Sequence, residues 1–286
     1  MAEKILVTGA TGKVGRELIP FLLDAGLEVK AGTRDPGSAR TLFSPEVEVV
    51  ELNYNRTETY DAALTWADRV FLMPPPFTPD AHEAITPFLD WAVSTKVEHV
   101  VLLSAMSMPE LDDLALRKVE RHLEAQDTAH TILRPNLYMQ NFHPGFISRQ
   151  IRAEGRIRLP AGRGRVSLVD VRDVAEVAAR ALSGNRHFGR SYTVTGGEAL
   201  TLEDVAGILS RAAGREIRYE PISDEAFREL LEAEPWRPAE VDVVVELFRS
   251  IRNDWRAPIH SALERVLGRA PRTFQEFVEE HAEAWG

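Results

Sequence analysis

The chain opens with three segments of different polarity in direct succession. Residues 5–7 (Ile-Leu-Val) form an apolar run, which is typical of a strand buried on both faces of a parallel sheet. Residues 9–15 are rich in glycine. Apolar side chains then recur at the spacing of one helical face, at Val14, Leu18, Phe21 and Leu22, and Gly26 can end that helix. The opening therefore predicts a strand, a glycine-rich turn and a helix.

Short apolar runs continue to alternate with helical patterns through the first half of the chain. Further strands are predicted at Glu28–Thr33, Val47–Leu52, Arg69–Met73, Val97–Leu103 and His130–Leu133. Helical patterns lie between them near residues 57–66, 79–95 and 110–126. This alternation predicts an α/β fold with a doubly wound parallel sheet of the Rossmann type.

The second half of the chain has a different pattern. Residues 143–165 show little periodicity and many Gly and Arg residues, so we expect a loop or flap there. A strand is predicted at Val166–Asp170, a helix at Asp170–Leu182 with Asp170 and Asp173 as capping residues, and mainly helix at residues 223–285. We expect an NAD(P)-binding Rossmann domain at 1–142 and 166–184, and a smaller, mainly helical substrate-binding lobe at 143–165 and 185–286.

Composition excludes several classes of protein. The 286 residues include no Cys, which excludes disulfides, thiolate zinc sites and a cysteine nucleophile. The net charge of −10 argues against a nucleic-acid binder. No apolar run approaches the ~20 residues of a membrane helix. We expect a cytoplasmic protein without membrane or nucleic-acid partners, a monomer or homodimer that acts on a small-molecule substrate.

The glycine-rich turn has the spacing G-x-x-G-x-x-G. Gly9 permits the tight turn, Gly12 lets backbone N–H groups approach a pyrophosphate, and Gly15 lets the helix pack close to the strand. The alternative is an ordinary tight turn. The spacing resembles that of the short-chain dehydrogenase/reductase superfamily, in its extended and atypical branches. The predicted cofactor contacts in this turn are Gly9, Thr11, Gly12, Lys13 and Val14.

Residues at the ends of the next two strands indicate how the adenine end of the cofactor is bound and whether NADP or NAD is preferred. Arg34 suits the 2′-phosphate of NADP, whereas an acidic residue such as Asp35 suits the ribose 2′-OH of NAD. Asp35 precedes Pro36 and can instead cap the next helix, so NADP(H) is favoured. Asn53 stands where related proteins usually carry Asp close to the adenine; the alternative is a turn residue.

Two further strand ends complete this side of the predicted site. Met73, Pro74 and Pro75 follow the fourth strand and would form a rigid wall beside the cofactor, or a rigid loop without a ligand. Ser104 follows the fifth strand, where short-chain dehydrogenases carry a catalytic Ser. Leu116 and Glu120 occupy the register of the Tyr and Lys that complete that catalytic set, so the usual Tyr-x-x-x-Lys pair is expected to be missing.

The sixth strand runs into residues 131–142, TILRPNLYMQNF. Together with TGATGKVG, the Arg34 position and GRAPRTFQEF at residues 268–277, this segment resembles the NmrA-like, atypical short-chain dehydrogenase/reductase family. Within that family the chain is most similar to bacterial NAD(P)H-binding reductases related to quinone, triphenylmethane-dye and ergot-alkaloid reductases. The resemblance implies that Pro135 and Asn136 lie near the nicotinamide, and Tyr138 is the only phenol close by in sequence.

These observations predict an NADPH-dependent oxidoreductase. It would transfer hydride to a small apolar or aromatic electrophile such as a quinone, an imine or iminium, or a conjugated carbonyl. Ser104 and Tyr138 are the candidate catalytic residues, and water can supply the proton instead. The alternatives are a redox sensor of NmrA type that binds NADP(H) without turnover, and an epimerase or lyase that uses bound NADP, against which the absent Tyr argues.

Overall fold

The computed structural model describes residues 2–106 and 114–285. The chain divides into two compact units. The first comprises Met1–Pro76, Asp80–Arg134 and Val174–Thr193, and the second comprises Phe77–Pro79, Pro135–Asp173 and Val194–Gly286. The assignment of a nucleotide-binding domain to 1–142 and 166–184, and of a substrate-binding lobe to the rest, stays a prediction.

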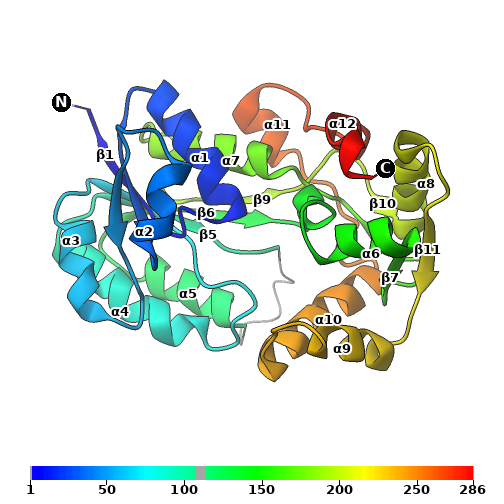
Figure 1. The fold of residues 1–286 in the computed structure, drawn as a ribbon. Coiled ribbons are helices and arrows are strands. Elements are labelled where there is room, and N and C mark those ends of the chain that lie inside the picture. The colour runs from blue at the N-terminus through cyan, green and yellow to red at the C-terminus, as the bar shows by residue number, and fades with distance from the viewer. Residues whose placement is uncertain (1, 107–113, 286) are drawn as a thin grey trace. The chain divides into compact units, whose positions relative to one another are not determined.

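The first unit is built on a seven-stranded sheet with the order β3-β2-β1-β4-β5-β6-β9 (Figure 1). Its strands are β1 (Lys4–Val7), β2 (Glu28–Thr33), β3 (Glu48–Glu51), β4 (Arg69–Leu72), β5 (His99–Leu103), β6 (Ala129–Pro135) and β9 (Arg190–Val194). Strands β1 to β6 pair in parallel. The apolar residues of β1, β4 and β5 are fully or almost fully buried, as the continuous apolar runs predict. The predicted doubly wound parallel sheet is confirmed.

Helices cover both faces of this sheet (Figure 1). They are α1 (Lys13–Asp24), α2 (Pro36–Ala39), α3 (Tyr60–Leu64), α4 (Ala81–Ser94), α5 (Ala115–Glu124) and most of α7 (Val171–Leu182). On the face covered by α3, α4 and α5, the rings of Tyr54 and Tyr60 each meet Phe88 edge-on, with centroids 5.2 Å apart. The first residues of the helix expected near 110–126 lie outside the described residues.

The second unit has its own apolar core. Its helices are α6 (Phe146–Glu154), α8 (Leu202–Ala213), α9 (Asp224–Glu232), α10 (Pro238–Arg252), α11 (Ala262–Leu267) and α12 (Phe274–Glu280). Strand β7 (Arg156–Leu159) pairs in parallel with β11 (Arg218–Pro221), and β8 (Arg165–Val166) pairs antiparallel with β10 (Leu200–Thr201). The core includes Phe142, Phe274 and Trp285, all fully buried. The predicted helical character of this part is borne out, with two short sheets added.

The prediction of a loop at residues 143–165 is wrong, because the segment forms α6 and β7. Ile147 and Ile151 are buried one helical turn apart, and Ile157 and Leu159 are buried at the alternate positions of a strand. Gly155 adopts a left-handed conformation, with φ of 63°, and ends the helix between them. The arginines that suggested a loop lie outside this core, where several pair with glutamates.

The strand predicted at Val166–Asp170 is also wrong beyond Val166. Strand β8 ends there, and the Ser167 N–H donates to the Arg256 carbonyl instead of to a neighbouring strand. The capping role of Asp170 is borne out, because its carboxylate accepts the Arg172 N–H at 2.8 Å at the start of α7. Asp173 does not cap; its carboxylate binds the Arg269 side chain and the Arg272 backbone.

No helix in 2–106 and 114–285 is long and apolar enough to cross a membrane. Within the same residues, no group of three or more His, Asp and Glu side chains is placed to hold a metal ion.

Candidate functional site

The turn between β1 and α1 depends on a close approach of backbone to backbone. Gly9 has φ of 59°, the left-handed region that favours glycine, and its carbonyl accepts the Gly12 N–H at 2.9 Å. A Cβ atom on Gly15 would lie 2.6 Å from the Gly9 oxygen and 2.8 Å from Ala10 Cα. Because both contacts are with backbone, neither can yield easily, and α1 can start this close to β1 only with glycine at position 15.

The N-terminus of α1 is left without a side-chain cap. Gly12 is the N-cap residue, and the described first turn of the helix holds no acidic side chain. The first helical bond runs from the Arg16 N–H to the Gly12 carbonyl, at 3.1 Å. The N–H groups of Val14 and Gly15 precede it and have no carbonyl one turn earlier in the helix. These N–H groups and the helix dipole together suit an anion such as a phosphate.

Two charged side chains at the end of β2, Arg34 and Asp35, differ in their hydrogen-bond partners. The Asp35 carboxylate accepts the Ser38 N–H at 3.2 Å and caps α2, as the sequence predicts. Hydrogen bonds from Ser38 lower the pKa of Asp35 below its ordinary value. Arg34 is exposed and makes no ion pair or side-chain hydrogen bond within the described residues. At this strand end the basic group is therefore available to a ligand, and the acidic group is engaged.

A hydroxyl network that the sequence analysis missed ties three strand ends together. The Tyr54 hydroxyl lies 2.8 Å from Thr8 Oγ1 and donates to the Met73 carbonyl at 3.0 Å. The Met73 N–H donates to Thr8 Oγ1 at 2.8 Å. Burial raises the pKa of Tyr54 well above its ordinary value, so the phenol stays protonated. The network fixes the residues after β1, β3 and β4 relative to one another.

The other predicted site residues at these strand ends are neighbours of this hydroxyl network. The Asn53 side-chain oxygen accepts the Asn55 N–H at 3.0 Å, which is the geometry of a turn residue. The Met73 side chain covers the glycine turn, because a Cβ atom on Gly9 would lie 2.2 Å from its Cε. Pro74 is buried and Pro75 half-buried after it. The structure thus brings Gly9, Gly12 and Met73 into one cluster.

Ser104 follows β5 and is 7% exposed. Its N–H donates to the Leu133 carbonyl at 2.8 Å. Glu120, which the sequence predicts to stand in the register of the Lys, binds the Arg134 guanidinium at 2.9 and 2.7 Å. The residue predicted to mark a missing catalytic pair therefore belongs to a buried ionic network with Arg134 and Arg117.

Pro135, Asn136 and Tyr138 belong to the second unit. The Asn136 amide nitrogen donates to Ser167 Oγ and to the Arg256 carbonyl, both at 2.8 Å, which uses both of its hydrogens. Its oxygen accepts the Leu137 N–H at 2.9 Å. Tyr138 is half-buried, and burial raises the pKa of its phenol well above the ordinary value. Asn136 thus has a structural role in addition to any contact with a ligand.

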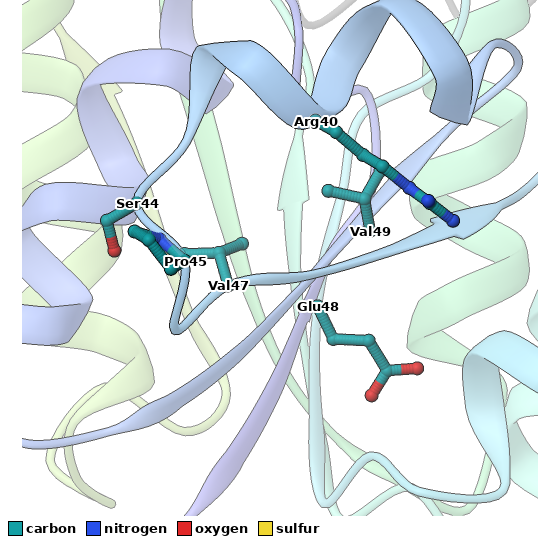
Figure 2. A pocket seen from close by; sticks show the side chains of 6 residues that line it. All are labelled: Arg40, Ser44, Pro45, Val47, Glu48 and Val49. Carbon is teal, nitrogen blue, oxygen red and sulfur yellow. The ribbon is translucent and has the colours of Figure 1, made fainter.

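A surface hollow elsewhere on the first unit does not coincide with these residues (Figure 2). Arg40, Ser44, Pro45, Val47, Glu48 and Val49 line it. Glu48 is the first residue of β3, whereas Asn53 follows the last. The hollow therefore lies at the amino end of that strand, opposite to the end at which parallel sheets bind ligands.

Known proteins resemble this chain in sequence and in fold. The NmrA-like family model matches residues 1–278. An NAD(P)H azoreductase from Xenophilus azovorans is 33% identical over 286 residues, which cover 99% of each chain. A (4-alkanoyl-5-oxo-2,5-dihydrofuran-3-yl)methyl phosphate reductase from Streptomyces griseus is 35% identical, with 98% of this chain and 99% of the relative covered. The crystal structure of the NADPH-dependent quinone oxidoreductase QOR2 from Escherichia coli, in complex with NADPH, shares the fold, with a TM-score of 0.85, 21% identity, and coverage of 97% and 99%.

The hydroxyl network predicts a measurable contribution of Tyr54 to stability. Tyr54→Phe keeps the ring contact with Phe88 but leaves the Met73 carbonyl and the Thr8 hydroxyl short of a partner. We expect the free energy of unfolding to fall by about 1–3 kcal/mol and Tm by roughly 2–4 °C per kcal/mol. Thermal unfolding measures this, with Thr8→Ser, which keeps the hydroxyl, as the control. A Tyr54→Phe protein as stable as the wild type would contradict the network.

Proposed function

Because this chain belongs to the NmrA-like family, we propose that it is an NADPH-dependent reductase that transfers hydride to a small, apolar or aromatic electrophile. The observation that carries the proposal is the uncapped N-terminus of α1 together with Arg34 at the end of β2, which has no ion pair within the described residues. An N-terminus of this kind suits the pyrophosphate of a dinucleotide, and an unpaired Arg suits a 2′-phosphate.

The proposed cofactor site follows the carboxyl ends of the strands. The pyrophosphate would lie on the turn of Gly9, Thr11 and Gly12 and on the first turn of α1, beside Lys13 and Val14. Burial lowers the pKa of Lys13 to about 8, and a bound phosphate would favour its charged form. The remaining proposed cofactor contacts are Arg34, Asn53, Met73, Pro74, Pro75, Ser104, Pro135 and Asn136.

The names of the relatives support a proposal for the class of hydride acceptor. One is named for reduction of azo compounds, and another for a substrate whose ring carries an oxo group and an alkanoyl side chain. The similar solved structure is named for quinones. These acceptors share a conjugated, electron-poor double bond that hydride can attack. We therefore propose a quinone, an imine or iminium, or a conjugated carbonyl as the substrate of this chain.

The chain's own residues would bind and orient the cofactor and exclude water, while NADPH supplies the hydride. The two candidate proton donors are poorly suited to that role. Burial raises the pKa of Tyr138, and an aliphatic hydroxyl such as that of Ser104 is a weak acid. Proton delivery from water after hydride transfer fits these observations. The same observations favour the second candidate function, a redox sensor of NmrA type that binds NADP(H) without turnover.

The first prediction concerns the choice of cofactor. Arg34→Ala should weaken NADPH binding by about 1.5–3 kcal/mol, because a charge-assisted hydrogen bond to the 2′-phosphate is lost, and should leave NADH binding nearly unchanged. Fluorescence titration of each cofactor measures this. Arg40→Ala is the matched control, because Arg40 lies near the amino end of β3 (Figure 2). Equal losses for both cofactors in Arg34→Ala would instead assign the ribose to Asp35 and the cofactor to NAD.

The second prediction concerns turnover. NADPH oxidation, followed by the loss of absorbance of the reduced nicotinamide, should occur with at least one class in a panel of quinones, azo compounds, cyclic imines and enones. The protein should first be shown to bind NADPH, and NADH at equal concentration should react more slowly. Tight NADPH binding without oxidation by any acceptor would contradict the reductase proposal and favour the sensor.

The third prediction concerns the proton. Tyr138→Phe keeps the ring and removes only the hydroxyl, so kcat with an active acceptor should stay close to that of the wild type. A positioned proton donor typically contributes ~10²–10⁴-fold to the rate. A loss of about a hundredfold in kcat, with NADPH affinity and folding unchanged, would show that Tyr138 is the donor.

A further inference from the structure

The side chain of Met73 fills the space beside two glycines of the turn between β1 and α1. A Cβ atom on Gly9 would lie 2.2 Å from the Met73 Cε. One on Gly12 would lie 3.0 Å from the same methyl group and 3.7 Å from the sulfur. We call this space, where other residues would have a Cβ atom, the notch. Since the sequence predicts that Gly12 leaves it open for a pyrophosphate, the thioether and the phosphates compete for one place.

The close contacts in this turn differ in what can move. At Gly15 the atoms nearest to an added Cβ atom belong to the backbone of Gly9 and Ala10, which does not yield easily. At Gly9 and Gly12 the nearest atom is the methyl end of Met73, an unbranched and flexible side chain. Rotation of that one side chain therefore empties the notch and leaves the packing of α1 on β1 intact.

The backbone of Met73 is held on both sides. Its N–H donates to Thr8 Oγ1 at 2.8 Å, and its carbonyl accepts the Tyr54 hydroxyl at 3.0 Å. Pro74 follows directly, and a residue before a proline is restricted to extended conformations. Met73 is also only half-buried. Movement at this position is therefore confined to the side-chain torsions, and the thioether is not enclosed on all sides.

We propose that Met73 is a gate residue, whose thioether occupies the notch until the phosphates of a dinucleotide displace it. The inference rests on the proposed function, because the phosphates must bind at this turn for the gate to act on them. Only molecules in which the side chain has rotated away can accept the cofactor. The association rate and the apparent affinity for NADPH are therefore lowered by the fraction of molecules in which the notch is open.

The association rate of NADPH tests the gate. Met73→Ala takes the thioether out of the notch, so the association rate constant should rise by about tenfold if the notch is open in roughly a tenth of wild-type molecules. Stopped-flow fluorescence of the nicotinamide measures this. The rate constant is more informative than the affinity, because the displaced side chain can contact the bound cofactor and slow its dissociation. Association with Met73→Ala that is no faster than with wild type would overturn the gate.

Met73→Leu is the matched control. Leucine has a similar volume and keeps an apolar side chain in the notch, so NADPH should associate with this variant no faster than with wild type. Thermal unfolding shows whether both variants are folded. An equal rise in the association rate for Met73→Leu and Met73→Ala would mean that occupancy of the notch does not limit binding, and would overturn the proposal.

Methyl NMR tests where the side chain lies. In protein with isotope-labelled methionine methyl groups, the Met73 signal is identified by its loss in Met73→Ala. Its protons should show nuclear Overhauser effects to the α-protons of Gly9 and Gly12 in the free protein, and saturation with NADPH should abolish them. Overhauser effects that persist in the complex, or that are missing from the free protein, would contradict the gate.

The same titration separates this inference from the proposed function. A folded wild-type protein that does not bind NADPH would contradict the proposed function itself. NADPH binding that leaves the contacts of Met73 with Gly9 and Gly12 in place would contradict only the gate.

Discussion

The close approach of the helix α1 to the strand β1 is the constraint on which the rest of the candidate site depends. At Gly15 the space that a side chain would need is taken by the backbone of Gly9 and Ala10. The approach places the first turn of α1 at the carboxyl end of the central strand, and the chain leaves that turn without a side-chain cap or an acidic residue. An uncapped helix end is unfavourable unless water or a ligand satisfies its N–H groups. The geometry that packs the fold thus also leaves N–H groups that suit an anion.

Polar groups around this turn divide into those that build the site and those that remain available to a ligand. The Thr8, Tyr54 and Met73 network holds the strand ends in place, and Asp35 is engaged in capping α2. Arg34 makes no such bond within residues 2–106 and 114–285. Because the structural roles are filled by neighbours, the positive charge at the end of β2 is the group that can select a phosphorylated cofactor.

Much of the fold could be predicted from the sequence because its signals are local. The apolar runs of β1, β4 and β5 are continuous, as buried parallel strands require, and Asp35 before Pro36 is a local sign of a helix start. The prediction of a loop at residues 143–165 failed because α6 and β7 are short. Each element buries only a few apolar side chains among several arginines. Neither the helical spacing nor the strand alternation of apolar residues is therefore evident in the sequence.

The contacts that could not be predicted from the sequence join residues that are far apart in the chain. Glu120 could be read as the residue in place of a catalytic Lys, but its partner Arg134 lies on another element. The sequence around Tyr54 does not indicate its hydrogen bond with Thr8, which lies 46 residues earlier. Both contacts are long-range and satisfy buried polar groups, which local periodicity does not encode. They determine how the site is held rather than where it lies.

The most direct test of the proposed phosphate site is residue-resolved hydrogen exchange in α1, measured with and without NADPH. If the first turn of the helix binds the phosphates, the amides of Val14 and Gly15 should exchange much more slowly in the complex, because they gain acceptors that the free helix does not offer. The amides of α12, in the second unit, serve as the internal reference. Saturating NADPH with unchanged exchange at Val14 and Gly15 would contradict the phosphate site and, with it, the proposed position of the cofactor.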